Sequence, residues 1–286
     1  MEPSRHRLQT TTVPLSYLAW GQGPTVMLLH GLADHGLVWQ PLAATLATDY
    51  RCLAPDLRGH GDSGKPDDPA AYDSLALVQD LETLAAAIVN DQETDGAIAV
   101  VAHSWAAKLA LLWAQHYPQR LRQLVLVDPF FVNQLPGLFR LTFPLLYRTL
   151  PFLQVMGPFD SYEAAAAVAR PLKQYRGWSP HQQAVFQGAM EQKPDGRWGS
   201  KFAIAARNGV FNDILNRAGL TTELDVPTLL LLPEQGLNRL AWQIKPYRTY
   251  LPNLQIQTIP GNHWPHLVQP AALNQAVANY LSESSA

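Results

Sequence analysis

Val-Val-Ala-His-Ser-Trp-Ala-Ala, residues 100–107, is the stretch that decides the fold, because it joins an apolar run to a helix-forming segment. A serine in a sharp turn between a strand and a helix is exposed at the end of the strand, as in the nucleophile motif G-x-S-x-G. Residues flanking such a serine are small because the turn is tight and strained. Here Ala102 and Ala106 take both glycine positions. The A-x-S-x-A pattern alone is a weak signal, but its surroundings predict a nucleophile at Ser104.

Short apolar runs alternate with helical patterns on both sides of this turn. The runs predicted to be strands are residues 25–29, 52–55, 97–101 and 124–127, and the predicted helices lie near 38–48, 73–90 and 107–116. Residues 7–12 and 14–20 alternate in polarity and predict a hairpin. Strands that are apolar on both faces and alternate with helices indicate an α/β fold, with a mostly parallel sheet covered on both sides.

The alternation stops after Asp128 and resumes near residue 226. Residues 129–223 contain helical, aromatic-rich stretches punctuated by prolines, and the later elements are an apolar strand at 226–232, a helix at 239–250, a strand at 254–259 and a helix at 270–282. We therefore expect one core, formed by residues 1–128 and 224–286, and a helical insertion at 129–223. Because the insertion follows a strand, it would lie over the carboxyl ends of the sheet, where open α/β folds bind ligands.

A serine nucleophile needs a base to accept its proton, an acid to orient that base, and donors for the oxyanion. In the chain order serine, acid, histidine, the base comes last. His263 follows the last predicted strand in Ile259-Pro-Gly-Asn-His-Trp-Pro-His266, so it occupies a turn rather than a helix face. We expect His263 to be the base, whereas His266 is expected to begin the final helix and to pack.

Three further segments carry a resemblance to a known family. Residues 56–66, Asp-Leu-Arg-Gly-His-Gly-Asp-Ser-Gly-Lys-Pro, match the motif D-x-R-G-x-G-x-S-x-x-P, His30-Gly31 matches an oxyanion-loop motif, and residues 260–270 match a catalytic-histidine loop. In these motifs the chain resembles the α/β-hydrolase fold superfamily, and the segment around Ser104 is similar to that of haloalkane dehalogenases and epoxide hydrolases. The resemblance implies a helical cap (lid), the 129–223 insertion, after the strand that ends near Val127. Asp56 and Arg58 are expected to brace the ends of the sheet.

The orienting acid has two candidates. Family members often carry it a few residues beyond the strand that ends here at Leu232, but Gly236 occupies that position and offers no carboxylate. The resemblance implies a second location, directly after the strand that precedes the cap, where this chain has Asp128. We expect Asp128 to be the acid, with Glu234 as the second candidate. Asp128 also has a structural alternative, since relatives keep an aspartate there, and Glu234 is otherwise an exposed loop charge.

The serine at position 104 decides the expected reaction class. The resemblance implies that dehalogenases and epoxide hydrolases of this fold use an aspartate nucleophile, and that dehalogenases have a halide-binding asparagine where this chain has Leu32. Serine suits acyl chemistry instead, in which a tetrahedral oxyanion collapses to an acyl-enzyme. The oxyanion donors are expected to be two backbone amides, those of Trp105 at a helix N-terminus and of Leu32 after His30-Gly31.

Composition excludes several functions. The chain of 286 residues has a net charge of −2 and a pI near 6.5, which gives no basic footprint for nucleic acid or anionic lipid. Cys52 is the single cysteine, so no intramolecular disulfide or cysteine-based metal cluster is possible. No apolar signal core opens the sequence, and no apolar run reaches the ~18 residues of a membrane span. We expect a cytoplasmic protein without an integral membrane segment, acting without cofactor or metal, as a monomer or a dimer.

The sequence as a whole predicts a serine hydrolase of esters or related acyl compounds. Ser104, His263 and Asp128 are the expected triad. The aromatic and leucine content of residues 129–159, including Phe139, Phe143 and Tyr147, favours a hydrophobic acyl or alkyl group under the cap. The same triad would serve a C–C bond hydrolase, thioesterase, lactonase or acyltransferase. A ligand-binding receptor or pseudo-enzyme with this fold is the alternative of another class.

Overall fold

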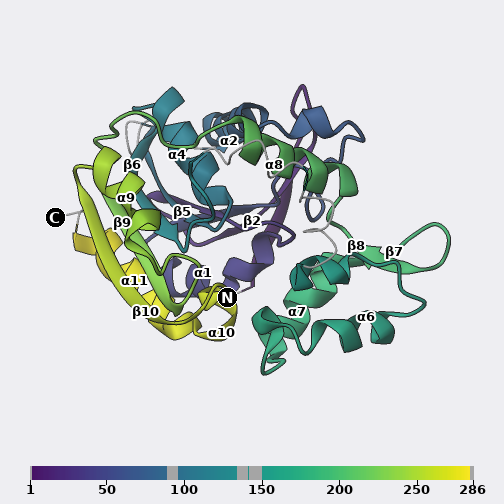
Figure 1. The fold of residues 1–286 in the computed structure, drawn as a ribbon. Helices are drawn as coiled ribbons and strands as arrows, with labels where there is room; N and C mark the ends of the chain where they lie inside the picture. Colours follow the sequence, from purple (N-terminus) through teal and green to yellow (C-terminus); the bar gives the residue numbers. More distant parts are fainter. Residues whose placement is uncertain (1, 89–95, 134–140, 142–149, 284–286) are drawn as a thin grey trace.

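The central sheet has eight strands in the order β1-β2-β4-β3-β5-β6-β9-β10 (Figure 1). In this computed structural model, which describes residues 2–88, 96–133, 141 and 150–283, the first strand pairs with the second and the second with the fourth in antiparallel fashion. The other neighbouring strands are parallel, as predicted. The strands are β1 Ser4–Leu8, β2 Leu15–Trp20, β3 Thr25–Leu29, β4 Arg51–Pro55, β5 Ile98–His103, β6 Leu121–Val127, β9 Thr228–Gln235 and β10 Leu254–Asn262.

Helices cover both faces of this sheet because the strand residues are apolar on both sides. In β3, Met27 and Leu29 pack with Leu77 and Leu109 of the helices above one face, whereas the alternate residues pack with the helices of the other face. Figure 1 shows α2 and α4 above the sheet and α1 and α11 below it. The core helices are η1 Gly36–Trp39, α1 Gln40–Leu46, η2 Pro69–Tyr72, α2 Ser74–Ile88, α4 Ala106–His116, α9 Ala241–Tyr250, α10 Pro265–Val268 and α11 Pro270–Glu283.

The segment between β6 and β9 is mainly helical in its described part. Its elements are η4 Pro151–Met156, α6 Tyr162–Ala169, η5 Lys173–Tyr175, α7 Pro180–Ala189, β7 Met190–Gln192, β8 Trp198–Ser200 and α8 Ile204–Asn216. β7 and β8 form an antiparallel hairpin, and Asp195 and Gly196 lie in the turn that joins them. In Figure 1, α6, α7 and this hairpin stand apart from the sheet, whereas α8 runs back toward the core helices.

The turn after β4 is held by Asp56 and Arg58, which were expected to brace the ends of the sheet. The Asp56 carboxylate accepts hydrogen bonds from the amides of Gly36 (2.8 Å) and Asp62 (2.9 Å). Arg58 forms a two-point contact with Asp80 of α2, at 2.7 and 2.6 Å. Such a fork-to-carboxylate pair fixes orientation as well as distance. The turn therefore ties β4 to α2 and to the loop after β3.

The prediction that His266 begins the final helix was wrong. His266 does not begin the final helix: it belongs to the short helix α10, and α11 begins separately at Pro270. Proline at position 270 explains the break, because its ring fixes φ and it lacks the amide that would continue the preceding helix. Within the described residues, no helix combines the length and the hydropathy needed to cross a bilayer.

Candidate active site

Ser104 lies in the turn between β5 and α4 with a left-handed backbone, at φ 55°. This conformation is uncommon for a residue with a side chain and is retained only where the surroundings impose it. The Ser104 amide donates to the carbonyl of Val127 at 3.0 Å, which ties the turn to the neighbouring strand β6. Ala102 and Ala106, on either side, are completely buried, so small side chains fit where the motif has glycine.

The structure brings the three side chains of the expected triad together. His263 Nε2 lies 2.9 Å from Ser104 Oγ, and His263 Nδ1 lies 2.7 Å from Asp128 Oδ2. The residues come from three segments, since Ser104 follows β5, Asp128 follows β6 and His263 follows β10. Because these strands are parallel, their carboxyl ends meet at one edge of the sheet. The result is a chain of hydrogen bonds from a hydroxyl through an imidazole to a carboxylate.

Asp128 is completely buried and its oxygens are held by several donors. The amide of Leu237 donates to Oδ2 at 2.8 Å, and the Asn238 side chain donates to Oδ1 at 3.0 Å. Burial of the carboxyl acts to raise its pKa, but the hydrogen bond and charge of His263, together with these donors, outweigh it and hold the pKa below the usual 3.8. Asp128 is therefore an ionised acceptor for the imidazole.

The second candidate acid lies elsewhere. Glu234, near the end of β9, is exposed, and among the described residues His263 contacts Asp128 rather than Glu234. Gly236 leaves the space that the Asp128 carboxylate occupies, because a Cβ built on residue 236 would lie 2.6 Å from Asp128 Oδ2. The space beside the imidazole is already filled by the Asp128 carboxylate, so a side chain at position 236 cannot share it.

Two backbone amides next to this turn have no acceptor of their own in the part of the chain that the structure describes. Among the described residues, the amides of Leu32 and Trp105 donate to no other group. Gly31 brings the first loop close to the turn, because a Cβ at this residue would lie 2.6 Å from His103 Nδ1 and 3.3 Å from Ser104 Cβ. The N-terminal end of α4 adds a partial positive charge beside Trp105. Both amides are thus available to an oxygen that develops negative charge near Ser104.

The loop that carries His263 is fixed from two sides. On the sheet side, His103 Nε2 lies 2.7 Å from the carbonyl of His263. On the other side, Asn262 donates to the carbonyl of Lys173 at 3.2 Å, and Gln182 of α7 donates to the carbonyl of Leu267 at 3.3 Å. The insertion between β6 and β9 therefore contacts the loop that presents the imidazole.

An aromatic group lines the side of His263 that faces the insertion. Trp264 packs edge-on against His263, with ring centroids 4.8 Å apart, and Phe152 of η4 lies 6.2 Å from Trp264. Phe139, Phe143 and Tyr147, which were expected to be part of the apolar lid, lie outside the described residues. The described part thus provides an apolar wall next to the imidazole.

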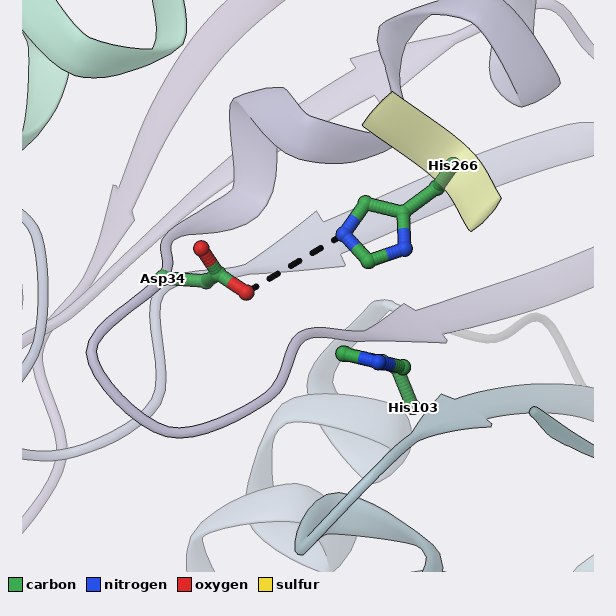
Figure 2. Close-up of side chains that lie close together, drawn as sticks. All are labelled: Asp34, His103 and His266. Atoms are coloured by element: carbon green, nitrogen blue, oxygen red, sulfur yellow. Dashed lines mark ion pairs between the residues drawn. The ribbon is translucent and has the colours of Figure 1, made fainter. Parts of the chain in front are cut away.

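Behind the turn lies a buried group of polar side chains that sequence reasoning did not identify as a site. Asp34, His103 and His266 come from the loop after β3, the end of β5 and α10 (Figure 2). Burial raises the pKa of Asp34 to about 8 and lowers that of His103 to about 3, and it lowers the pKa of His266 well below its usual value. No sequence spacing links positions 34, 103 and 266, so only the fold reveals that they meet.

Comparison with known proteins identifies relatives of the chain. Residues 24–270 match the model of a family described as "alpha/beta hydrolase fold". The chain is 31% identical to Epoxide hydrolase 2 of Siraitia grosvenorii over 140 residues, covering 48% of this chain and 43% of that protein. It is 33% identical to a haloalkane dehalogenase of Mesorhizobium japonicum over 128 residues, covering 44% and 39%. The matched region therefore spans less than half the length of each of these relatives.

A solved structure shows the same fold over the full length. The crystal structure of E-2-(acetamidomethylene)succinate hydrolase superposes with a TM-score of 0.81, covering 98% of this chain and 100% of that one, at 20% identity. At 20% identity, this structural likeness shows the fold alone.

Proposed function

Since the chain belongs to the α/β-hydrolase fold family, we propose that it is a serine hydrolase that cleaves a carboxylic ester or a related acyl compound through an acyl-enzyme. The observation that carries the proposal is the hydrogen-bonded series Ser104 Oγ, His263 Nε2 and Nδ1, Asp128 Oδ2, with separations of 2.9 and 2.7 Å. Both distances are within the reach that general-base activation of a hydroxyl requires. The left-handed backbone of Ser104 adds support, because strain of this kind is concentrated at functional sites.

In the first half of the proposed reaction, Ser104 Oγ attacks the acyl carbon while His263 Nε2 accepts its proton. Asp128 accepts the Nδ1–H of His263, which fixes the tautomer that leaves Nε2 free, and it stabilises the imidazolium that forms. The amides of Leu32 and Trp105 donate to the tetrahedral oxyanion. When the oxyanion collapses, the imidazolium gives its proton to the leaving alkoxide, and the acyl-enzyme remains.

The second half repeats these steps with water. His263 removes a proton from a water molecule that attacks the acyl-enzyme carbonyl, the same two amides bind the new oxyanion, and Ser104 leaves with the proton from the imidazolium. Each donor in such an oxyanion site is worth about 3 kcal/mol of barrier stabilisation. The residues named here provide the proton transfers and the oxyanion donors for both halves.

Hydrolysis of an epoxide or a haloalkane, for which two of the relatives are named, is disfavoured by Ser104. Attack of a serine hydroxyl on an alkyl carbon would give an ether, which has no carbonyl for water to attack. An acyl-enzyme ester has such a carbonyl and is cleaved by the same machinery that formed it. The residue at position 104 therefore favours acyl substrates within this family.

Residues 129–223 are proposed to form a cap over this site, and residues 1–128 and 224–286 the core. Contacts of α7 and η5 with the His263 loop support the assignment, as does the apolar wall formed by Phe152 and Trp264. Ligand sites of this kind are mostly apolar, with a few polar groups that fix orientation. The substrate is accordingly proposed to be a small molecule with a hydrophobic acyl or alkyl group.

Turnover of p-nitrophenyl esters of increasing acyl length tests this function. We expect saturable hydrolysis by the wild type, a preference for the more hydrophobic esters, and a loss of at least about 10³-fold in kcat for Ser104→Ala. Ser4→Ala removes an exposed serine on β1 and serves as the matched control with unchanged turnover. Thioester, lactone and C–C-cleavable analogues of the best ester then identify the preferred bond. Equal turnover by wild type and Ser104→Ala would contradict the proposal and favour a ligand-binding protein.

A further inference from the structure

Asp34, His103 and His266 converge on one buried point next to the proposed triad. One side-chain donor atom from each residue lies within 4.8 Å of the others, and all three side chains are buried. Figure 2 shows the Asp34 carboxylate and the His266 ring facing each other above the His103 ring, with Asp34 Oδ2 4.0 Å from His266 Nε2. Asp34 lies in the loop after β3, His103 directly precedes Ser104, and His266 lies in α10, shortly after His263.

These side chains hold polar atoms that nothing else satisfies. Within the described part of the chain, Asp34 Oδ2, His103 Nδ1 and both ring nitrogens of His266 are buried without a hydrogen-bond partner. Buried polar groups are nearly always paired, because an unpaired one forfeits its interaction with water. His266 is 2% exposed and His103 1%, so bulk solvent does not reach these atoms. Four orphaned atoms at one point indicate a missing ligand.

The arrangement is rich in lone pairs. His103 Nε2 donates its hydrogen to the carbonyl of His263, which leaves Nδ1 as an acceptor. A histidine that ligates a metal typically donates its other ring N–H to a backbone carbonyl in this way. A neutral His266 ring has one acceptor nitrogen, and the Asp34 carboxylate is an acceptor when ionised. Each of the three residues thus has one atom that can offer a lone pair to the same buried point.

We propose that Asp34, His103 and His266 bind one divalent transition-metal ion of the zinc type. An ion accepts a lone pair from all three residues at once, whereas a single water molecule has only two hydrogens to donate. The ion also stabilises the ionised form of the Asp34 carboxyl, which burial alone disfavours.

The distances fit a site that closes by small side-chain movements. Two ligand atoms at 2.0–2.2 Å from a tetrahedral zinc are roughly 3.3 Å apart. Asp34 Oδ2 and His266 Nε2 are 4.0 Å apart, so this pair must approach by less than about 1 Å. The His266 and His103 rings meet edge to face, with centroids 4.5 Å apart and planes at 67°, so the two imidazoles are already neighbours at this point.

The donor set selects the class of ion. Imidazole suits zinc, copper, iron and nickel, whereas magnesium and calcium prefer ligands that are all oxygen. Two imidazoles and one carboxylate with an open fourth position are one of the common three-ligand zinc arrangements. The proposed metal site is additional to the proposed hydrolysis, for which we expect no metal. The metal proposal does not depend on the hydrolase proposal.

Zinc binding to metal-free protein, with any affinity tag removed, tests the site. Isothermal titration with Zn²⁺ is expected to give one ion per chain for the wild type and equally for Ser104→Ala, so that failure of the hydrolase proposal leaves this result unaffected. Asp34→Asn and His266→Gln are each expected to weaken binding at least about tenfold. His116→Gln, which changes an exposed histidine on α4, is the matched control and is expected to leave binding unchanged. Mg²⁺ is expected not to compete.

Cobalt provides a readout that needs no substitution at the site. We expect Co²⁺ to produce the visible absorption of a tetrahedral nitrogen and oxygen site and Zn²⁺ to abolish it. The proposal is overturned if the folded wild type shows no saturable Zn²⁺ binding and no such spectrum, which would indicate a buried water instead. Binding that persists in both folded site variants, or that disappears in His116→Gln, would overturn it as well.

Discussion

The Asp128 carboxylate has the contacts that a triad acid requires, and Glu234 does not. Asp128→Asn keeps the shape but favours the wrong imidazole tautomer, so we predict a fall in kcat of about 10⁴-fold. Glu234→Gln is the control and is predicted to stay near the wild type, because Glu234 is exposed. Steady-state kinetics on the best ester measures both. Two small and equal losses would mean that neither residue orients His263.

Gly236 is predicted to protect the position of that carboxylate. In Gly236→Ala the new Cβ would lie 2.6 Å from Asp128 Oδ2, so the carboxylate must shift away from the imidazole. We expect a lower kcat and a loss of about 1–3 kcal/mol in the free energy of unfolding, as for other overpacked sites. Leu237→Ala keeps the backbone amide that binds Asp128 and is the matched control for kcat. A fully active Gly236→Ala would contradict this role.

Single residues were predictable from the sequence where a motif marks them. Ser104 and His263 have neighbours typical of their loops, and Gly236 directs attention to Asp128 because glycine has no carboxylate. The structure brings these side chains into contact, and their catalytic roles remain predictions. Asp34 and His266 were not identified as a site, because their proximity arises from the packing of separate loops and leaves no local pattern.

At the scale of elements, a buried ion pair joins α4, which follows Ser104, to α8 at the end of the insertion. Lys108 Nζ lies 2.5 Å from Asp213 Oδ2, and both side chains are buried. Asp213 also accepts hydrogen bonds from the amide and hydroxyl of Ser74 in α2. Burial lowers the pKa of Lys108, and the charge of Asp213 opposes that shift. The pair therefore connects three helices over one face of the sheet.

Removal of one partner is predicted to destabilise the protein strongly. Lys108→Met leaves the buried Asp213 carboxylate with only the partly exposed Arg217 guanidinium, 3.7 Å away, as a cationic neighbour among the described residues, and we expect a cost of about 3 kcal/mol in the free energy of unfolding. The double variant Lys108→Met/Asp213→Leu is expected to recover most of this loss, because both charges are then absent. Urea denaturation of the single and double variants measures the difference. A double variant no more stable than the single one would contradict the account.

Helices and strands were predictable from the sequence where their apolar residues follow a simple pattern. The inner strands β3, β5 and β6 are apolar on both faces, so their composition alone indicates parallel pairing. The insertion was less predictable, since its helices pack against different neighbours. The pairing of Asp213 with Lys108 fixes α8 to the core helices, and a helical pattern in the sequence does not say which surface the helix covers.

For the whole molecule, the lowered pKa of Asp128 predicts a contribution to the pH dependence of stability. A carboxyl whose pKa is lower in the folded than in the unfolded state stabilises the fold above its unfolded pKa, near 3.8, and loses this effect as the pH falls through the folded value. The difference in unfolding free energy between wild type and Asp128→Asn should therefore shrink below pH 3.8. Denaturation curves over a pH series measure it, and a constant difference would contradict the prediction.

Activation of the Ser104 hydroxyl by the His263 imidazole is tested by labelling with a fluorophosphonate probe, followed by intact-mass and peptide mass spectrometry. We expect one adduct per chain, located on the peptide that contains Ser104, formed much more slowly in His263→Ala and absent in Ser104→Ala. A wild-type protein that forms no adduct, or forms it on another residue, would contradict the account.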